Sequence, residues 1–222
     1  MKKIVFALLM VLMTSFLPSS AQQLAQTGRE VKELVPEGWT VQEAWGDLFH
    51  NGRDHLVLLA VPNNPAGITT RDDGYEINSN KPVLAIYYMS EEGDLIRRFE
   101  SDIVIPVLED MDYSTDVELV VTEKGSLKIT LITFFSAGSY ISPGQSYTFR
   151  YQDDDFYLIG EDSQYHSRVT GDGESISTNY LTCKQSRTSY NVFEDPPQEP
   201  KTRWKRIERK PLRQLGSFTL GE

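Results

Sequence analysis

The sequence contains very little cysteine and no excess of positive charge. Cys183 is the only cysteine among 222 residues, which excludes a disulfide framework and a cysteine-rich zinc module. The formal net charge is −10 at pH 7, whereas nucleic-acid-binding surfaces are basic, so we expect no nucleic-acid partner. Hydrophobic residues make up 39% of the chain and aromatic residues 11%, which is enough for a packed core and excludes a disordered chain.

Long apolar runs are also missing, except for one at the start. Ile4–Met13 is apolar throughout but too short to span a bilayer as a mature helix. Lys2 and Lys3 precede it, and the small residues Ser19 and Ala21 follow. This pattern predicts a bacterial secretory signal peptide over residues 1–21, cleaved after Ala21, with an N-terminal membrane anchor as the alternative. We expect no transmembrane segment in the mature chain and a periplasmic or secreted location.

The charges are spread unevenly along the mature chain. Loss of Lys2 and Lys3 changes the charge from −10 to −12, and residues 201–222 hold seven basic residues against Glu208 and Glu222. That segment therefore carries +5, which leaves −17 on residues 22–200. The basic segment either docks on the acidic body as a terminal strand or contacts an anionic surface. Trp204 and Ile207 favour docking, because a solvated tail has little use for them.

Period-two alternation predicts two hairpins in the middle of the chain. The first joins strands at 116–122 and 127–135 through the turn Lys124-Gly125, and the second joins 147–151 and 156–159 through the turn 152–155. Other segments are assigned from apolar runs, turn residues and Pro/Gly content: a short helix within 22–34, strands at 55–61, 83–89, 95–99, 175–182 and 204–207, a loop at 63–82 and a linker at 194–200.

These elements predict a mainly β fold, because no amphipathic helices of 10–15 residues lie between the strands. We expect an antiparallel meander that forms a twisted sheet, a sandwich or a partly open barrel, with at most one short N-terminal helix. Residues 22–222 are expected to form a single β-rich domain with a core at about 36–193 and the basic C-terminal segment at 201–222.

The segment that follows Gly46 resembles a calcium-binding loop. Such loops place oxygen ligands at alternate positions and glycine at position six. With Asp47 as position one, Asn51 is position five and Gly52 is position six. A hard cation would be held by Asp47, Asn51, Asp54 and the Arg53 carbonyl, and calcium is the one cofactor that the sequence suggests.

Two positions of this loop depart from the calcium pattern. Phe49 occupies position three and His55 position nine, so two oxygen donors are replaced. The alternative is a loop that keeps its turn geometry without metal. There, Asp47 would cap backbone amides, and Asn51-Gly52 would supply left-handed residues.

The loop and the strands after it together resemble a group of exported bacterial β-rich proteins of unassigned function, with an FG-GAP-like or VCBS-like D-x-N-x-D-G start. The similarity covers about residues 36–184, and its most specific part is the aromatic hairpin Y-x-F-R-Y-x-x-x-x-F-x-L-I-G. The matching segments are Pro82–Ile86 with Gly93, Leu127–Ser139, Tyr147–Gly160 and Ser177–Lys184. Cys183 stands where glycine is usual. The resemblance implies a β-rich exported domain and no catalytic residues.

Catalytic patterns are weak throughout. The sequence has no G-x-S-x-G and no H-E-x-x-H motif. Cys183 and His166 are a conceivable nucleophile and base, but the thiol is expected to be an inert packed residue of a strand. The acidic runs at 109–112 and 153–155 are interpreted as solvated turns. We therefore assign no catalytic residue.

Aromatic residues of both parities crowd the central strands. Tyr147, Tyr151 and Tyr157 are the candidates for an exposed ligand-binding face, with carbohydrate or peptide as the ligand. The alternative is a sheet buried on both faces. The sequence thus favours an exported, non-catalytic binding or structural module of the bacterial envelope. A weak calcium-binding structural domain and a hydrolase are the other hypotheses.

Overall fold

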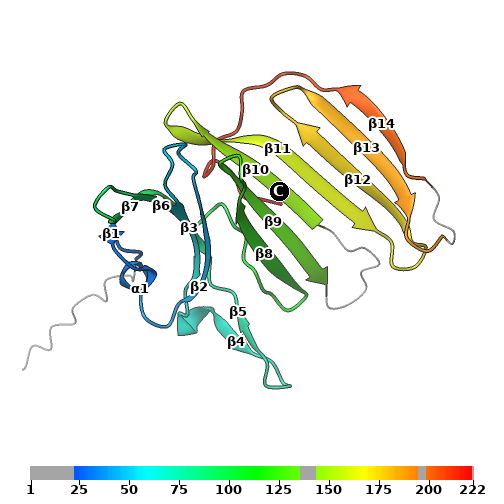
Figure 1. The fold of residues 1–222 in the computed structure, drawn as a ribbon. Helices are drawn as coiled ribbons and strands as arrows, with labels where there is room; N and C mark the ends of the chain where they lie inside the picture. Colours follow the sequence, from blue (N-terminus) through cyan, green and yellow to red (C-terminus); the bar gives the residue numbers. More distant parts are fainter. Residues whose placement is uncertain (1–22, 136–143, 195–198, 222) are drawn as a thin grey trace, which may run out of the picture.

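The computed structural model describes residues 23–135, 144–194 and 199–221 (Figure 1). The predicted signal peptide at 1–21 and most of the predicted linker at 194–200 lie outside these residues. Within them the chain is mainly β, and every strand pairing is antiparallel, as predicted. No helix in this part of the chain has the length and hydrophobicity needed to cross a membrane.

The N-terminal half forms a five-stranded sheet in the order β1-β7-β6-β3-β2. Its strands are β1 (Thr27–Gly28), β2 (Thr40–Gly46), β3 (His55–Val61), β6 (Val83–Met89) and β7 (Leu95–Ser101). The central strands β3 and β6 are nearly continuous apolar runs, because both of their faces are buried. The five-stranded sheet is therefore buried on both faces at its centre.

The C-terminal half forms a seven-stranded sheet in which the strands follow the order of the sequence (Figure 1). Its strands are β8 (Tyr113–Val121), β9 (Ser126–Phe135), β10 (Gly144–Gln152), β11 (Asp155–His166), β12 (Asp172–Asn179), β13 (Lys184–Asn191) and β14 (Lys201–Arg206). Both predicted hairpins are confirmed as β8–β9 and β10–β11. Asp153 and Asp154 make the second turn with φ of 50° and 62°.

The remaining elements are short. Helix α1 (Val31–Leu34) is the expected N-terminal helix, and η1 (Pro65–Gly67) is a single 3-10 turn. The segment 63–82 was predicted to be a loop, but β4 (Ile68–Thr70) and β5 (Glu76–Asn78) pair within it. The side-chain amides of Asn78 and Asn80 donate to the carbonyls of Pro62 and Asn64, both at 3.0 Å, and so hold this hairpin to the preceding chain. Composition alone does not reveal this side-chain role.

The main core lies between the two large sheets. On β9, Leu127, Ile129 and Leu131 are buried in alternation, as predicted, and they pack in one cluster with Val57 and Leu59 of β3. A second cluster covers the opposite face of the five-stranded sheet, beneath α1. Burial of apolar area in these two layers is the main source of stability.

The two chain ends also enter these clusters. Leu24 and Leu34 are buried beside the five-stranded sheet, and Leu215 and Leu220 lie in the main core. The buried core thus extends beyond residues 36–193 in both directions. It includes the end of the segment that is basic in sequence.

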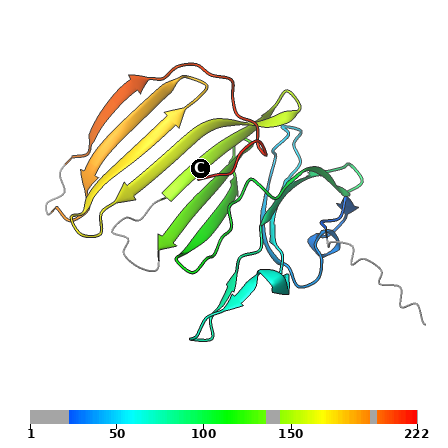
Figure 2. The same cartoon turned by 180° about the vertical axis from the view of Figure 1, so that it is seen from behind.

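The C-terminal segment 207–221 folds back from β14 toward the main core (Figure 2). β12 pairs with β11 only from Gly160 onward, so the first residues of β11 are left without a neighbour on that side. The amide of Leu158 donates to the Arg213 carbonyl at 2.8 Å, and the amide of Leu215 donates to Phe156 at 2.8 Å. The segment therefore closes this part of the sheet edge.

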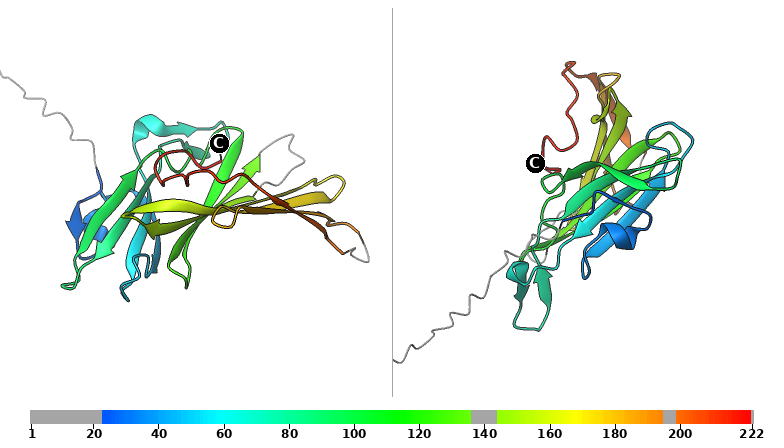
Figure 3. Two further views of the ribbon diagram at one scale, coloured as in Figure 1. Left: turned by 90° about the horizontal axis from the view of Figure 1, so that it is seen from above. Right: turned by 90° about the vertical axis from the view of Figure 1, so that its left-hand side faces the viewer.

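The outer half of the seven-stranded sheet, β12 to β14, projects past the five-stranded sheet as a single layer (Figure 3). None of its hydrophobic side chains is among the buried ones, and all six residues of β14 are exposed. The inner half, β8 to β11, carries the packed face. The strand predicted at 204–207 is β14 at 201–206. The strand predicted at 175–182 is β12 at 172–179, because residues 180–183 form the turn to β13.

Candidate functional site

The predicted metal loop forms a tight turn after β2 that is closed by one carboxylate. Asp47 Oδ1 accepts the amide of Asn51 at 2.9 Å, and Oδ2 accepts the amide of Gly52 at 2.8 Å. Burial disfavours ionisation of Asp47, but these two amide hydrogen bonds outweigh it and lower the pKa of the carboxyl group. Asp47 thus caps backbone amides, as the metal-free alternative proposed.

The left-handed residues of this turn differ from that alternative. Positive φ occurs at His50 (55°) and Gly52 (77°), not at Asn51. The side chain of Asn51 is used elsewhere: its Oδ1 accepts the amide of Arg53 at 3.1 Å and lies 2.9 Å from His55 Nε2. The Asn51 side chain therefore connects the backbone of the loop to the His55 ring at the start of β3.

His55 lies at position nine of the pattern and is completely buried. Its Nδ1 accepts the amide of Met89 at 2.9 Å, so Nε2 carries the proton that is donated to Asn51 Oδ1. Burial lowers the pKa of His55 and outweighs the opposing charges of Asp47 and Asp54. The histidine is therefore a neutral structural bridge between β3 and β6.

Phe49, at position three, joins the two sheets through aromatic contacts. Its ring centroid is 4.6 Å from His55 and 5.5 Å from Tyr88 on the five-stranded sheet, and 4.6 Å from Tyr151 and 5.7 Å from Phe156 on the seven-stranded sheet. All four pairs are edge-to-face, a favourable geometry for aromatic rings. Of the two departures from the calcium pattern, Phe49 therefore contacts rings of both sheets, and His55 is one of the rings on which it packs.

The loop also packs on the turn between β8 and β9. Gly125 has a φ of 65°, and a Cβ there would lie 2.5 Å from both the Asp47 carbonyl oxygen and the His50 ring. A Cβ on Gly46 would lie 2.4 Å from Val121. These two glycines allow the loop and the turn to approach closely.

The structure brings only part of the predicted metal set together. Asp47 and Asn51 share hydrogen bonds within the turn, whereas Asp54 is exposed. Among residues 23–135, 144–194 and 199–221, no three His, Cys, Asp or Glu side chains are grouped so that they could share a metal ion. The geometry is that of an inter-sheet joint.

The three tyrosines predicted to form a ligand face do not share one. Tyr147 is buried, with its hydroxyl accepting the amide of Gly221 at 2.9 Å and donating to Gln145 at 2.9 Å. Tyr151 packs on Phe49 on the face of the seven-stranded sheet that is turned toward the core. Tyr157 lies on the opposite face of this sheet. The C-terminal segment that covers Tyr147 is distant in sequence, which is why local alternation did not reveal its burial.

Cys183 and His166 lie at opposite ends of the β11–β12 pair, so they do not form a nucleophile and base. Cys183 was expected in a strand, but it is in the turn after β12 with a φ of 54°. Its thiol donates to the Tyr180 carbonyl at 3.6 Å. This left-handed position explains why glycine would suit it.

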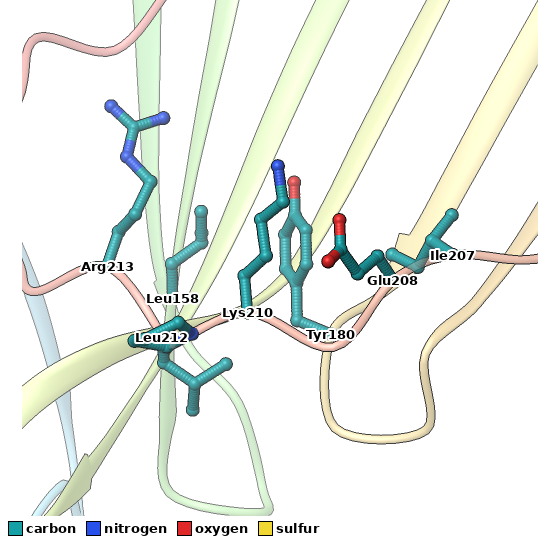
Figure 4. Close-up of a pocket in the computed structure, with 8 residues that line it drawn as sticks. Leu158, Tyr180, Ile207, Glu208, Lys210, Leu212 and Arg213 are labelled. Atoms are coloured by element: carbon teal, nitrogen blue, oxygen red, sulfur yellow. The ribbon is translucent and has the colours of Figure 1, made fainter.

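A pocket of about 390 Å³ lies between the C-terminal segment and the sheet (Figure 4). Leu158, Tyr180 and Leu212 line it, and Glu208, Lys210 and Arg213 add charged groups. The Tyr180 hydroxyl donates to Glu161 at 2.7 Å, and burial together with this bond raises the pKa of Tyr180. The Tyr180–Glu161 pair thus links the turn after β12 to β11 at the wall of the pocket.

The open face of the seven-stranded sheet carries a polar row that sequence reasoning missed. Cross-strand pairing aligns one residue from each strand on this face, and six of the seven are polar: Glu118, Thr130, Ser146, Asp162, Ser177, Ser186 and, on β14, Trp204. Ser186 is buried within the row. The first five, from Glu118 to Ser177, line a hollow of about 510 Å³. The row depends on register between seven strands, whereas each strand alone shows only an ordinary polar alternation.

The edge strand β14 is the second surface that the sequence did not resolve. Alternation places Lys201, Arg203 and Lys205 on one face, and Thr202 and Trp204 on the other. The basic segment therefore docks as a terminal strand, which was one of the two interpretations of its charge. Trp204 does not anchor it, because its side chain is 70% exposed.

Comparison of the chain with protein-family models, with curated proteins and with solved structures found no match.

Proposed function

We propose that this protein is an exported, non-catalytic binding module of the bacterial envelope, and that it presents the outer half of the seven-stranded sheet to its ligand. The observation that carries the proposal is the single layer formed by β12, β13 and β14. Sheets in globular domains normally bury one face against a second layer. Within the residues that the structure describes, no second layer of strands packs on β12 to β14, although Thr178 and Ser186 are buried. The inner half carries the packed face.

The chemistry of the open surface supports a polar ligand. One face carries hydroxyl groups, with Thr188 and Thr202 hydrogen-bonded to one another at 2.9 Å across β13 and β14. The other face carries charged groups, with Arg187 paired to Glu174 at 3.0 Å. Aligned hydroxyl, carboxylate and guanidinium groups on a stiff sheet favour recognition through hydrogen bonds.

Export and binding can be tested in the cells that produce the protein. A photo-crosslinking amino acid placed at Ser177, Thr188 or Arg187 should give covalent adducts in the exported fraction. The same residue at Val41 or Ile103, which are exposed but lie outside the outer half, should not. The exported chain should begin at Gln22. Absence of adducts from the outer half, or an uncleaved chain inside the cell, would contradict the proposal.

A further inference from the structure

The free side of β14 has unused hydrogen-bonding capacity. The strand pairs with β13 on one side, and it is the last strand of the sheet order. Within the residues that the structure describes, no other strand pairs with its second side. An unpaired strand edge presents a row of backbone amides and carbonyls that a further strand can satisfy.

The charges along this edge have one sign. Lys201, Arg203 and Lys205 project from the same face, and Arg206 follows. None of the four forms an ion pair with an acidic side chain of residues 23–135, 144–194 or 199–221. These four cations are therefore available to an acidic partner.

The other face of β14 offers an aromatic surface. Trp204 is 70% exposed, and it borders a hollow of about 340 Å³ with Lys184, Lys205 and Arg206. Charged side chains on an edge can protect a sheet from unwanted pairing, but an exposed tryptophan works against that purpose. Exposed tryptophans are typical of the centres of binding sites.

A second copy of this chain does not suit the edge. Antiparallel pairing of β14 with another β14 would set cations opposite cations, and like charges across a strand pair are destabilising. An acidic strand would instead face Lys201, Arg203 and Lys205 with opposite charges.

We propose that an extended acidic segment of a partner protein adds to β14 as an eighth antiparallel strand. The inference rests on the proposed binding function and names its partner class. Because strand side chains alternate, the segment carries Asp or Glu at every second position to face the three cations. An apolar residue of the opposite parity packs on Trp204.

Two synthetic peptides of identical composition test this inference with the purified exported protein. One alternates Glu with Val over ten residues, and the other groups all Glu residues at one end. By fluorescence anisotropy we expect the alternating peptide to bind at least tenfold more tightly. Hydrogen exchange should slow at amides of 201–206 when it binds. Equal affinities for the two peptides would overturn strand addition.

Backbone methylation separates strand pairing from simple charge attraction. In a strand, alternate amides point to opposite edges, so N-methylation of the Glu residues and N-methylation of the Val residues block different edges. One modified peptide should bind as before, and the other should lose binding. Equal behaviour of the two would show that backbone pairing is not involved and would overturn the inference.

Substitutions on β14 should weaken the alternating peptide. The double variant Arg203→Glu/Lys205→Glu should lose at least tenfold in affinity, and Trp204→Thr should lose several-fold. The matched control Lys81→Glu/Lys124→Glu changes the net charge equally at two exposed positions away from β14, and should retain binding. Equal losses in both double variants would overturn the inference.

Other outcomes distinguish this inference from the proposed function. Binding of β14 to vesicles of anionic phospholipid, with no affinity for the alternating peptide, would overturn strand addition. If crosslinks from Ser177 and Thr188 occur while β14 gains no protection in cells, the binding module stands and the edge inference fails. If neither surface gives adducts, both fail.

Discussion

The inner and outer halves of the seven-stranded sheet share one hydrogen-bonded lattice but are stabilised differently. On β9 of the inner half, Leu127 and Ile129 are completely buried against the five-stranded sheet. On β14 of the outer half, every residue is exposed. The outer half is therefore held by cross-strand hydrogen bonds and by continuity with the inner half. In one continuous sheet, the inner half thus provides the packed core, and the outer half provides exposed surface.

Removal of a buried ring should show this division most strongly. Phe149→Ala, in β10 of the inner half, should lower the free energy of unfolding by about 4 kcal/mol, because it leaves a large cavity. Trp204→Ala, in the outer half, should change it by about 0.5 kcal/mol or less. Urea denaturation of both variants measures the difference. Comparable losses would mean that β14 contributes to a core.

The joint between the sheets should be the next most sensitive point. Phe49→Ala removes four aromatic contacts that link the five-stranded sheet to the inner half, so we expect a loss of about 2–3 kcal/mol in urea denaturation. Phe134→Ala, which truncates a 42% exposed ring on β9, is the matched control and should lose less than about 1 kcal/mol. Equal losses of unfolding free energy in the two variants would show that Phe49 does not link the two sheets.

The same joint should weaken at mildly acidic pH. The pKa of His55 is lowered in the folded protein below its ordinary value of 6.5. The unfolded chain therefore binds the proton first, so stability is complete above about pH 6.5 and is lost as the pH falls toward the folded-state pKa. The urea midpoint should fall between pH 7 and pH 5.

In the His55→Gln variant the midpoint should start lower, since the bridge to Met89 is weakened, but should depend less on pH over this interval. A wild-type profile that is flat from pH 7 to pH 5, or one matched by the variant, would contradict the neutral bridge.

In the outer half, relief of backbone strain should raise stability slightly. Cys183→Gly removes a Cβ from a left-handed position, and we expect a gain of about 0.5–1 kcal/mol in urea denaturation. Cys183→Ala keeps the Cβ, so its stability should stay near that of the wild type. A gain of the same size in both variants would assign the effect to the thiol.

Calcium should have the smallest effect. Both carboxylate oxygens of Asp47 already accept backbone amides, and Phe49 fills position three of the loop. The melting temperature in millimolar calcium should therefore match that in a chelator to within about 1 °C. A rise of several degrees that Asp47→Asn abolishes would restore the calcium interpretation.

Local alternation predicted much of the fold. The β8–β9 and β10–β11 hairpins, and the buried positions Leu127, Ile129 and Leu131, followed from period two in the sequence, because side chains on a strand alternate between faces. The role of Asp47 was also open to prediction, because an aspartate four and five residues before the amides that it accepts is a local interaction.

Tertiary structure decided what these elements face. Tyr147 is buried because Gly221, far along the chain, folds over it, and Phe49 became a joint because β6 and β11 converge on its loop. The exposure of β14 depends on where the five-stranded sheet ends. Sequence patterns encode which side chains share a face, whereas contacts between distant segments determine which faces are covered and which remain available to a ligand.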